Sequence, residues 1–120
     1  MKENNLSTGH LGEAIAKEYL ENQGYKIIVQ NYRTKYCEID LIARDKKSLV
    51  FVEVKTKIGE EFGSPEEAIT RSKIRRLTRG VFIYLTREGD AKDYRIDAVC
   101  IVLDKAGNAE RISHHKNITF

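Results

Sequence analysis

The sequence predicts an α/β fold in which helices flank a mixed β-sheet, with the element order α-β-β-β-α-β. Three observations support this prediction. An amphipathic helical segment opens the chain, and three apolar, β-branched segments separated by polar residues follow it. A second amphipathic helix then precedes another long apolar segment, residues 94–103. Helices and strands in this order favour an α/β sandwich.

The first predicted helix begins at a cap formed by Ser7 or Thr8 and ends at Gly24. Its core-facing stripe is made of apolar residues at helical spacing: Leu11, Ala14, Ile15 and Tyr19. Glu13 lies on a flank of that stripe. We therefore expect its carboxylate to line a cleft beside the core.

Three strands are expected after this helix, over residues 25–30, 38–43 and 49–55. The run Ser64-Pro65-Glu66-Glu67 is a capping-box pattern with proline at the first helical position, which predicts a short helical turn. A longer helix is expected over residues 71–87, and its core face is formed by Ile74, Leu77, Val81 and Tyr84 or Leu85. Strand 94–103 follows, and a further short strand is predicted near residues 110–113.

Length and composition indicate one domain over residues 1–120. The 120-residue chain has no internal repeat or flexible linker, and its 41% hydrophobic content is enough for one core. No apolar run is long enough to span a bilayer, and the N-terminal residues lack the apolar segment of a signal peptide. We therefore expect a cytoplasmic protein without a membrane partner. The net charge of +3 permits a polyanionic partner but does not require one.

The second and third strands carry the main chemical signal. If their hairpin turns symmetrically about Lys46–Lys47, Asp40 lies opposite Glu53 and Ile42 opposite Phe51. Glu38 then lies opposite Lys55. Side chains alternate between the faces of a strand, so Val50, Val52 and Val54 point one way while Phe51, Glu53 and Lys55 point the other. In the same way Ile39 shares a face with Leu41 and Ala43.

Opposed carboxylates on a sheet are unfavourable unless something compensates for their charge. Lys55 can neutralise only part of the charge of Glu38, Asp40 and Glu53. A divalent cation would resolve the conflict, and Mg²⁺ binds to carboxylates together with water and phosphate oxygens. Two acids, a metal and a lysine at a sheet edge are a site suited to phosphodiester hydrolysis. The alternative interpretation is a solvated strand end, which is the commoner fate of a Glu-x-Lys tripeptide.

Asp40 followed by Glu53-Val54-Lys55 resembles the PD-(D/E)XK motif of the restriction-endonuclease-like nucleases. The chain is most similar to the YraN family of predicted endonucleases, which is related to archaeal Holliday junction resolvases. The matching stretches cover nearly the whole chain: Gly12-Glu13-x-x-Ala16, Tyr19-Leu20, Gly24-Tyr25, Asn31, EIDLIA, VFVEVK, Phe62-Gly63, Lys73, Tyr84-Leu85, Arg95-Ile96-Asp97 and the tail from His114 to Phe120.

The resemblance implies a restriction-endonuclease-like α-β-β-β-α-β core and a role for each matching residue. Asp40 and Glu53 match the metal-binding acids, Glu13 matches the helix acid of related resolvases, and Lys55 matches the catalytic lysine. The implied cofactor is Mg²⁺ or Mn²⁺, and the implied substrate is DNA, including branched or repair and recombination intermediates. Paired cuts on a four-way junction would favour a homodimer, although the sequence shows no interface.

Two positions depart from the pattern. Ile39 replaces the proline of the nominal motif, which changes little. Cys37 occupies the position before Glu38-Ile39-Asp40 where similar sequences usually have glycine. A side chain there is expected to narrow the approach of a phosphate or a backbone.

Basic residues gather on the second long helix, where five positive charges fall within nine residues: Arg71, Lys73, Arg75, Arg76 and Arg79. Like charges at four-residue steps repel each other, and a phosphate backbone would relieve that repulsion. A solvated outer helix face is an equally weighted alternative. Arg33, Lys35 and Lys57 extend positive charge around the predicted site. No basic segment interleaved with aromatic residues is evident, so we expect backbone and shape recognition with little base readout.

The remaining polar candidates are weaker. Asp97 interrupts an apolar strand and is expected to pair with Arg95 or a helix end, with catalysis as the less favoured role. His114 and His115 lack acidic or cysteine partners at zinc spacing, and Cys100 is expected to be reduced and packed in the core. Two other functions stay open: a non-catalytic nucleic-acid-binding module, and a protein-interaction domain that recruits a partner strand to the sheet edge.

Overall fold

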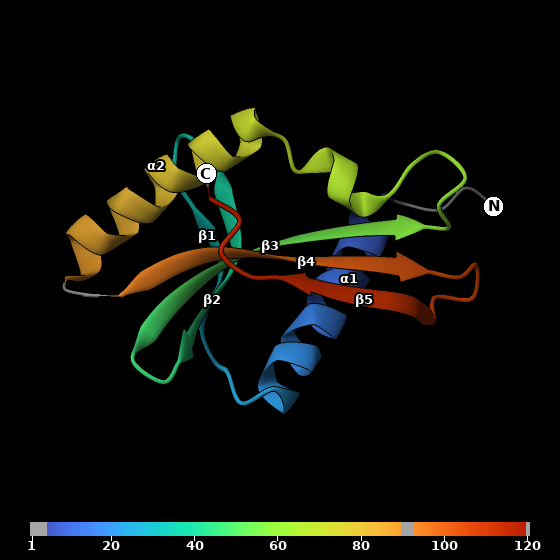
Figure 1. Cartoon of the computed structure of the whole chain (residues 1–120), viewed down its shortest axis with the longest axis horizontal. Helices are drawn as coiled ribbons and strands as arrows, with labels where there is room; N and C mark the ends of the chain where they lie inside the picture. The colour runs from blue at the N-terminus through green and yellow to red at the C-terminus, as the bar shows by residue number, and fades with distance from the viewer. Residues whose placement is uncertain (1–4, 90–92, 120) are drawn as a thin grey trace.

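The computed structural model describes residues 5–89 and 93–119, so Phe120, at the end of the tail that resembles the YraN family, lies outside the described residues. Figure 1 shows two long helices lying against a twisted sheet. In chain order, the elements are α1 (Asn5–Asn22), β1 (Lys26–Arg33), β2 (Glu38–Asp45), β3 (Ser48–Ile58), the short 3₁₀ helix η1 (Pro65–Ala68), α2 (Arg71–Glu88), β4 (Tyr94–Leu103) and β5 (Ala109–His115).

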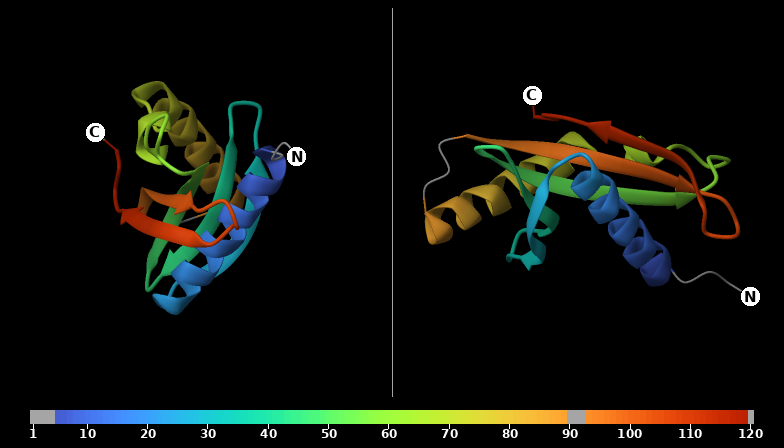
Figure 2. Two further views of the ribbon diagram at one scale, coloured as in Figure 1. Left: turned by 90° about the vertical axis from the view of Figure 1, so that its right-hand side faces the viewer. Right: turned by 90° about the horizontal axis from the view of Figure 1, so that it is seen from below.

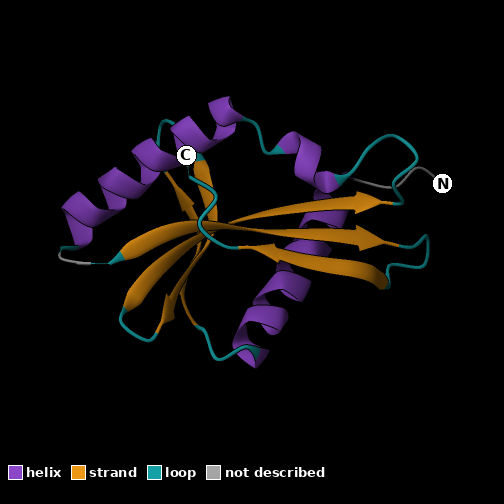
Figure 3. Ribbon diagram, viewed as in Figure 1, coloured by secondary structure: helices purple, strands orange, loops and turns teal. Residues whose placement is uncertain are grey.

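The sheet has five strands in the order β1-β2-β3-β4-β5 (Figure 3). Strands β3 and β4 are parallel, and the other neighbouring pairs are antiparallel. Parallel neighbours need a long crossover, which η1 and α2 supply here. The predicted mixed sheet, the predicted fold class and the additional last strand are therefore confirmed.

The β2–β3 hairpin has the predicted register. Five aligned pairs run from Asp45–Ser48 to Leu41–Val52, and Ile42 lies opposite Phe51. Only Lys46 and Lys47 form the loop, and Lys46 adopts a left-handed φ of 57°. A loop of two residues fixes which side chains of the two strands share a face.

One face of the sheet is covered by α1, as the two views of Figure 2 show. The predicted stripe is wrong in part, because Leu11 is 40% exposed and Ala14 is also exposed. The helix instead lies on the sheet through small residues, Gly12 and Ala16, with Leu20 completing the buried face. A Cβ on Gly12 would come 1.8 Å from the Thr56 hydroxyl oxygen, so glycine permits this close approach of α1 to β3.

The opposite face is covered by α2. Its buried residues are Ile74, Leu77, Gly80, Val81 and Tyr84, which confirms the predicted core positions. Thr70 caps the helix by accepting a hydrogen bond from the Lys73 amide at 3.2 Å. The predicted capping box before η1 is also present, since the Glu67 carboxylate accepts a hydrogen bond from the Ser64 amide at 2.8 Å.

Three local expectations need correction. Helix α1 already includes Asn5, so it does not begin at Ser7 or Thr8. Strand β3 continues to Ile58, because its parallel pairing with β4 extends to the Ile58–Leu103 pair. Ile39 belongs to the core under α2 and not to the core under α1 that contains Leu41, because the aligned β2–β3 pairs end at Leu41. None of the helices described is long and apolar enough to cross a membrane.

Candidate metal and nucleic-acid site

The site is centred on Asp40, at the point where the regular pairing of β2 with β3 ends. Asp40 is 8% exposed, and its Oδ2 atom accepts a hydrogen bond from the Val54 amide at 2.8 Å. The side chain of Asp40 thus takes the place of a backbone acceptor on the neighbouring strand. This bond fixes the carboxylate beside β3, next to the predicted Glu53-Val54-Lys55 segment.

Asp40 and Glu53 form a buried pair of carboxyls. Burial, together with the neighbouring Glu53 carboxylate, raises the pKa of Asp40 to about 8. Burial also raises the pKa of Glu53, which is 5% exposed, although the ammonium group of Lys73 opposes that rise. Two carboxyls so placed do not both ionise without a compensating cation.

Glu53 has one satisfied oxygen and one orphaned oxygen. Its Oε2 atom lies 3.3 Å from the Lys73 ammonium, which α2 contributes. Its Oε1 atom is buried and has no hydrogen-bond partner among the described residues. The Lys55 ammonium favours the ionised form of Glu53 and so partly opposes the rise of its pKa that burial causes. A buried, unpartnered carboxylate oxygen is a ready ligand for a cation.

A second group of acids contains Asp40 as well. Carboxylate oxygens of Glu13, Glu38 and Asp40 all lie within 4.8 Å of one another. The Asn31 side-chain amide donates to Glu13 at 2.9 Å, and the Arg33 guanidinium pairs with Glu38 at 2.8 Å. Glu38 is therefore held by Arg33 of β1, whereas the hairpin register had predicted Lys55 opposite it. We call the four residues Glu13, Glu38, Asp40 and Glu53 the acid site.

The acid site meets a groove along the end of β3. The groove has a volume of about 540 Å³, and Glu13, Lys55 and Lys57 line it together with Phe62. Glu13 belongs both to the acid site and to this groove. The catalytic lysine predicted from the motif, Lys55, thus lies on the groove side of the acids.

The basic residues of α2 divide into two groups. Lys73 faces inward and pairs with Glu53, so it lies with the acids and not with the outer basic residues. The exposed residues are Arg71, Arg75, Arg76 and Arg79, which we call the arginine row. The Arg79 guanidinium lies 5.4 Å from the centre of the Tyr36 ring, and the Lys35 ammonium lies 5.3 Å from it. The loop before β2 and the arginine row therefore lie side by side.

Asp97 has the structural role that the sequence favoured. It is fully buried and pairs with Arg95 at 3.0 Å and with the His114 ring at 2.8 Å. The Asn117 amide also donates to it at 2.9 Å. Burial opposes its ionisation, but these three partners together outweigh burial and hold its pKa below the ordinary value. Asp97 ties β4 to the tail of the chain.

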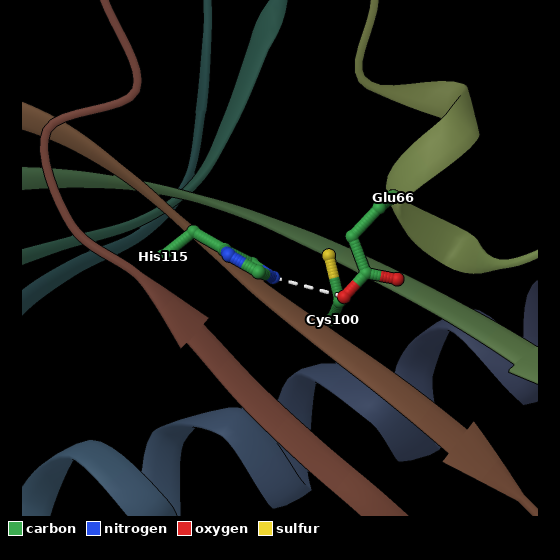
Figure 4. Close-up of side chains that lie close together, drawn as sticks. All are labelled: Glu66, Cys100 and His115. Carbon is green, nitrogen blue, oxygen red and sulfur yellow. Dashed lines mark hydrogen bonds and ion pairs between the residues drawn. The ribbon is translucent and has the colours of Figure 1, made fainter.

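A second cluster, missed in the sequence, brings Glu66, Cys100 and His115 together from three elements (Figure 4). The expectation that His115 lacks such partners is wrong, because its Nε2 atom lies 2.9 Å from Glu66. Both Glu66 oxygens also accept hydrogen bonds from Arg111, at 2.7 and 3.0 Å, and Arg111 lowers the pKa of Glu66 to about 2. Burial raises the pKa of Cys100 to about 12. The Arg111 guanidinium paired with Glu66 and the protonated Cys100 thiol both disfavour a metal ion here. The cluster therefore serves to connect η1 with β5.

The Cys37 side chain lies against helix α2. A Cβ on Gly80 would lie 2.7 Å from the Cys37 sulfur, so the cysteine packs where the helix has no side chain. The departure from glycine at position 37 is thus accommodated by a glycine on α2.

The acid site fits a divalent cation. It offers carboxylates on three elements, an orphaned buried oxygen and an elevated carboxyl pKa, all of which a bound cation would relieve. Asn31 and Lys73 are partners of the acid site that reasoning from the acids alone did not identify: Asn31 donates to Glu13, and Lys73 pairs with Glu53. Asn31 adopts a left-handed φ of 54°, which directs a polar side chain from an irregular point of β1. No periodicity in the sequence signals that geometry.

A mixed five-stranded sheet covered by helices, with acids and a lysine at the end of its central hairpin, is consistent with the restriction-endonuclease-like core. The chain belongs to the YraN family, described as "Uncharacterised protein family UPF0102", whose pattern matches residues 12–101.

Relatives support this membership over most of the chain. A UPF0102 protein of Syntrophus aciditrophicus is 43% identical over 104 residues, covering 86% of this chain and 82% of its own. One from Alkaliphilus metalliredigens is 41% identical over 115 residues, covering 95% and 97%. One from Chlorobium chlorochromatii is 46% identical over 91 residues, covering 76% and 70%.

Proposed function

We propose that this protein is a metal-dependent DNA endonuclease that hydrolyses phosphodiester bonds. The observation that carries the proposal is the buried Asp40–Glu53 pair, in which one Glu53 oxygen is orphaned and the Asp40 carboxyl is held on β3 by the Val54 amide. Asp40, Glu53 and Glu13 would hold Mg²⁺ or Mn²⁺, and Glu38 is a secondary candidate ligand. When bound, such an ion lowers the pKa of a water and polarises a phosphate.

Lys55 would position the attacking water and stabilise negative charge that develops on the phosphate. It lies on the strand next to Glu53 and lines the groove that also contains Glu13. A lysine at this place supplies a mobile ammonium without adding bulk to the acids. Branched DNA and repair or recombination intermediates are the substrates that the family resemblance favours.

DNA would be held through its phosphates. Positive charge on the exposed surface around the site comes from the arginine row on α2, from Arg33 paired with Glu38, from Lys35 beside Tyr36 and from Lys57 in the groove. Lys73, which pairs with Glu53, is excluded from this role until a cation replaces it. A dimer would allow paired cuts on a junction, and its formation is part of the proposal.

The test is cleavage of branched, single-stranded and duplex DNA in Mg²⁺ or Mn²⁺ by the wild type, Glu53→Ala and Lys55→Ala. Arg87→Ala, an exposed change at the far end of α2, serves as the matched control. Cleavage by the wild type and the control, and its loss in both site variants, is the expected result. Equal residual cleavage in all four proteins would point to contamination and sink the catalytic proposal.

A second function, a binding module without turnover, is favoured by one observation. Two of the acids already have cationic partners, Lys73 on Glu53 and Arg33 on Glu38, so part of the charge is balanced without a metal. Such a module would bind DNA with an affinity that divalent ions do not change. Titration of DNA with and without Mn²⁺ separates the two functions, because the nuclease proposal expects tighter binding when the acids are neutralised.

A further inference from the structure

Phe62 is the most exposed large apolar side chain among the described residues, at 93%. It lies in the loop between β3 and η1, at the mouth of the groove that Glu13 and Lys55 line. A nearly fully solvated phenylalanine beside a polar site leaves a large apolar surface in water, which a bound partner would cover.

The loop that carries Phe62 is anchored on both sides. Arg111 of β5 binds Glu60 at 3.2 Å and Glu66 at 2.7 Å, so one guanidinium holds residues before and after the ring. His115 adds a contact to Glu66, which Figure 4 shows. The ring is therefore displayed by a braced loop, and its exposure does not come from a loose end of the chain.

A positive charge accompanies the ring. The Lys57 ammonium lies 3.4 Å from the Phe62 carbonyl oxygen, and Lys57 and Lys55 line the same groove. Two acids directly precede the ring: Glu60 is paired with Arg111, and Glu61 is exposed beside Phe62. An aromatic face with adjacent ammonium groups is the arrangement that binds an unpaired base by stacking and its phosphate by charge.

We infer that Phe62 is a stacking platform for an unpaired nucleobase next to the phosphate that occupies the lysine groove. The inference rests on the proposed nucleic-acid function and adds the substrate feature that the site selects: a single-stranded or frayed nucleotide at the cut. A base within an intact duplex keeps both faces stacked and offers none to Phe62. The sequence shows no basic segment interleaved with aromatic residues and predicts backbone and shape recognition with little base readout, so stacking on Phe62 adds to that prediction.

The experiment uses full-length protein in a Lys55→Ala background, which removes the proposed catalytic lysine but retains the acids and keeps Lys57 in the groove to bind the phosphate. Phe62→Leu, Phe62→Tyr and the control Ile28→Ala are compared; Ile28 is another exposed apolar residue, 39% exposed, on β1. Each binds, in Mn²⁺, an oligonucleotide carrying 2-aminopurine, as a single strand and as a duplex. Fluorescence reports both affinity and stacking.

Phe62→Leu is expected to weaken single-strand binding by about fivefold to a hundredfold, the range for losing one base–aromatic stack. It should also abolish the quenching of 2-aminopurine, while duplex binding stays within about twofold. Phe62→Tyr and Ile28→Ala should keep both signals. No detectable single-strand binding, or an equal loss on single strand and duplex, would overturn the inference.

Two further readouts separate the inference from its rivals. Sedimentation of the Phe62→Leu variant tests self-association, and loss of a dimer with unchanged single-strand affinity would assign the ring to a second copy and overturn the inference. Cleavage is measured with Lys55 restored. Cleavage that does not depend on Phe62 would refute the stacking platform alone, whereas Phe62-dependent binding without cleavage would refute the nuclease alone.

Discussion

The Asp40 carboxylate accepts a 2.8 Å hydrogen bond from the Val54 amide, so a side chain from β2 continues the contacts with β3 after the aligned pairs end at Leu41. One Asp40 oxygen is thereby committed to β3, and the other stays available to the acid site. The same bond links the position of the acid to the strand that carries Glu53 and Lys55.

Asp40→Asn and Asp40→Ala separate the two roles of this residue. Asparagine keeps an oxygen for the Val54 amide and removes a carboxyl whose ionisation beside Glu53 is unfavourable, so the variant should be at least as stable as the wild type in EDTA. Alanine leaves the buried amide unpaired and should lose about 1–3 kcal/mol. Added Mn²⁺ should raise the melting temperature of the wild type but of neither variant, as measured by thermal unfolding. A full Mn²⁺ shift in Asp40→Asn would exclude Asp40 as a ligand.

Lys73→Met should bind Mn²⁺ more tightly than the wild type, by about tenfold, which corresponds to about 1.4 kcal/mol. The reason is that the ammonium 3.3 Å from Glu53 competes with any cation at that carboxylate. Calorimetric titration with Mn²⁺ gives the affinity, and Arg76→Met, an exposed change on the same helix, is the control. Weaker Mn²⁺ binding by Lys73→Met alone would show that the lysine orients Glu53 instead of competing.

Asp97 should make folding stability depend on pH on the acid side. Its pKa is lowered in the folded protein, so its ionised form contributes stability above the unfolded pKa of about 4, and that stability is lost as the pH falls below it. Asp97→Asn should lose about 1–3 kcal/mol at neutral pH, since it weakens the buried hydrogen bonds from Arg95 and the Asn117 amide, while Asp45 still pairs with Arg95. Urea unfolding from acidic to neutral pH measures this. An unchanged slope of stability against pH in the variant would contradict the assignment.

Gly12→Ala should destabilise the protein by about 1–3 kcal/mol, the usual cost of overpacking. The new methyl group would meet the Thr56 side chain, 1.8 Å from its hydroxyl oxygen, and push α1 away from β3. Gly9→Ala on the same helix meets nothing within 4 Å and should stabilise it by up to about 1 kcal/mol through helix propensity. Denaturant unfolding compares the two, and equal effects would mean that α1 does not pack against β3 through Gly12.

The double variant Arg75→Gln, Arg79→Gln should bind DNA more weakly and with a smaller dependence on salt. Fewer phosphate contacts form, so fewer counterions are released on binding. Both arginines are exposed on α2 and line a second groove, of about 570 Å³, with Phe82 and Tyr94. Binding measured over a series of salt concentrations provides the slope. Lys105→Gln, an exposed change in the β4–β5 turn, is the control, and an unchanged slope in the double variant removes this helix face from the interface.

The hairpin and its acids could be predicted because their geometry is local. A two-residue loop determines the register of the strands beside it, and strict alternation then determines which β3 residues share a face. Strands β1 and β2 depart from alternation. β1 has an irregularity between Ile27 and Val29, and in β2 Ile39 changes face where a side-chain acceptor replaces the regular pairing. A sequence pattern carries no sign of that replacement.

The partners of the acids could not be predicted, because they come from elements whose placement is set by tertiary packing. In the sequence, Lys73 is one of several basic residues on a basic helix. Only the packing of α2 against the sheet places it next to Glu53. Nothing in the sequence indicates that Phe62 is exposed, and only the structure shows its loop outside both apolar clusters. Leu11 was predicted to face the core but is exposed, because small residues of α1, Gly12 and Ala16, lie closest to the sheet.

The parallel pairing of β3 with β4 sets an order for folding. The β2–β3 hairpin closes over a loop of two residues, a contact of low sequence separation, whereas β4 can join β3 only after the segment that contains η1 and α2 has closed. Asp40 and Glu53 are therefore brought together by a fast, local event, and Lys73 reaches Glu53 with the slower long-range one. A hairpin formed at neutral pH holds two like charges until the crossover docks, so its formation is expected to be faster in mild acid.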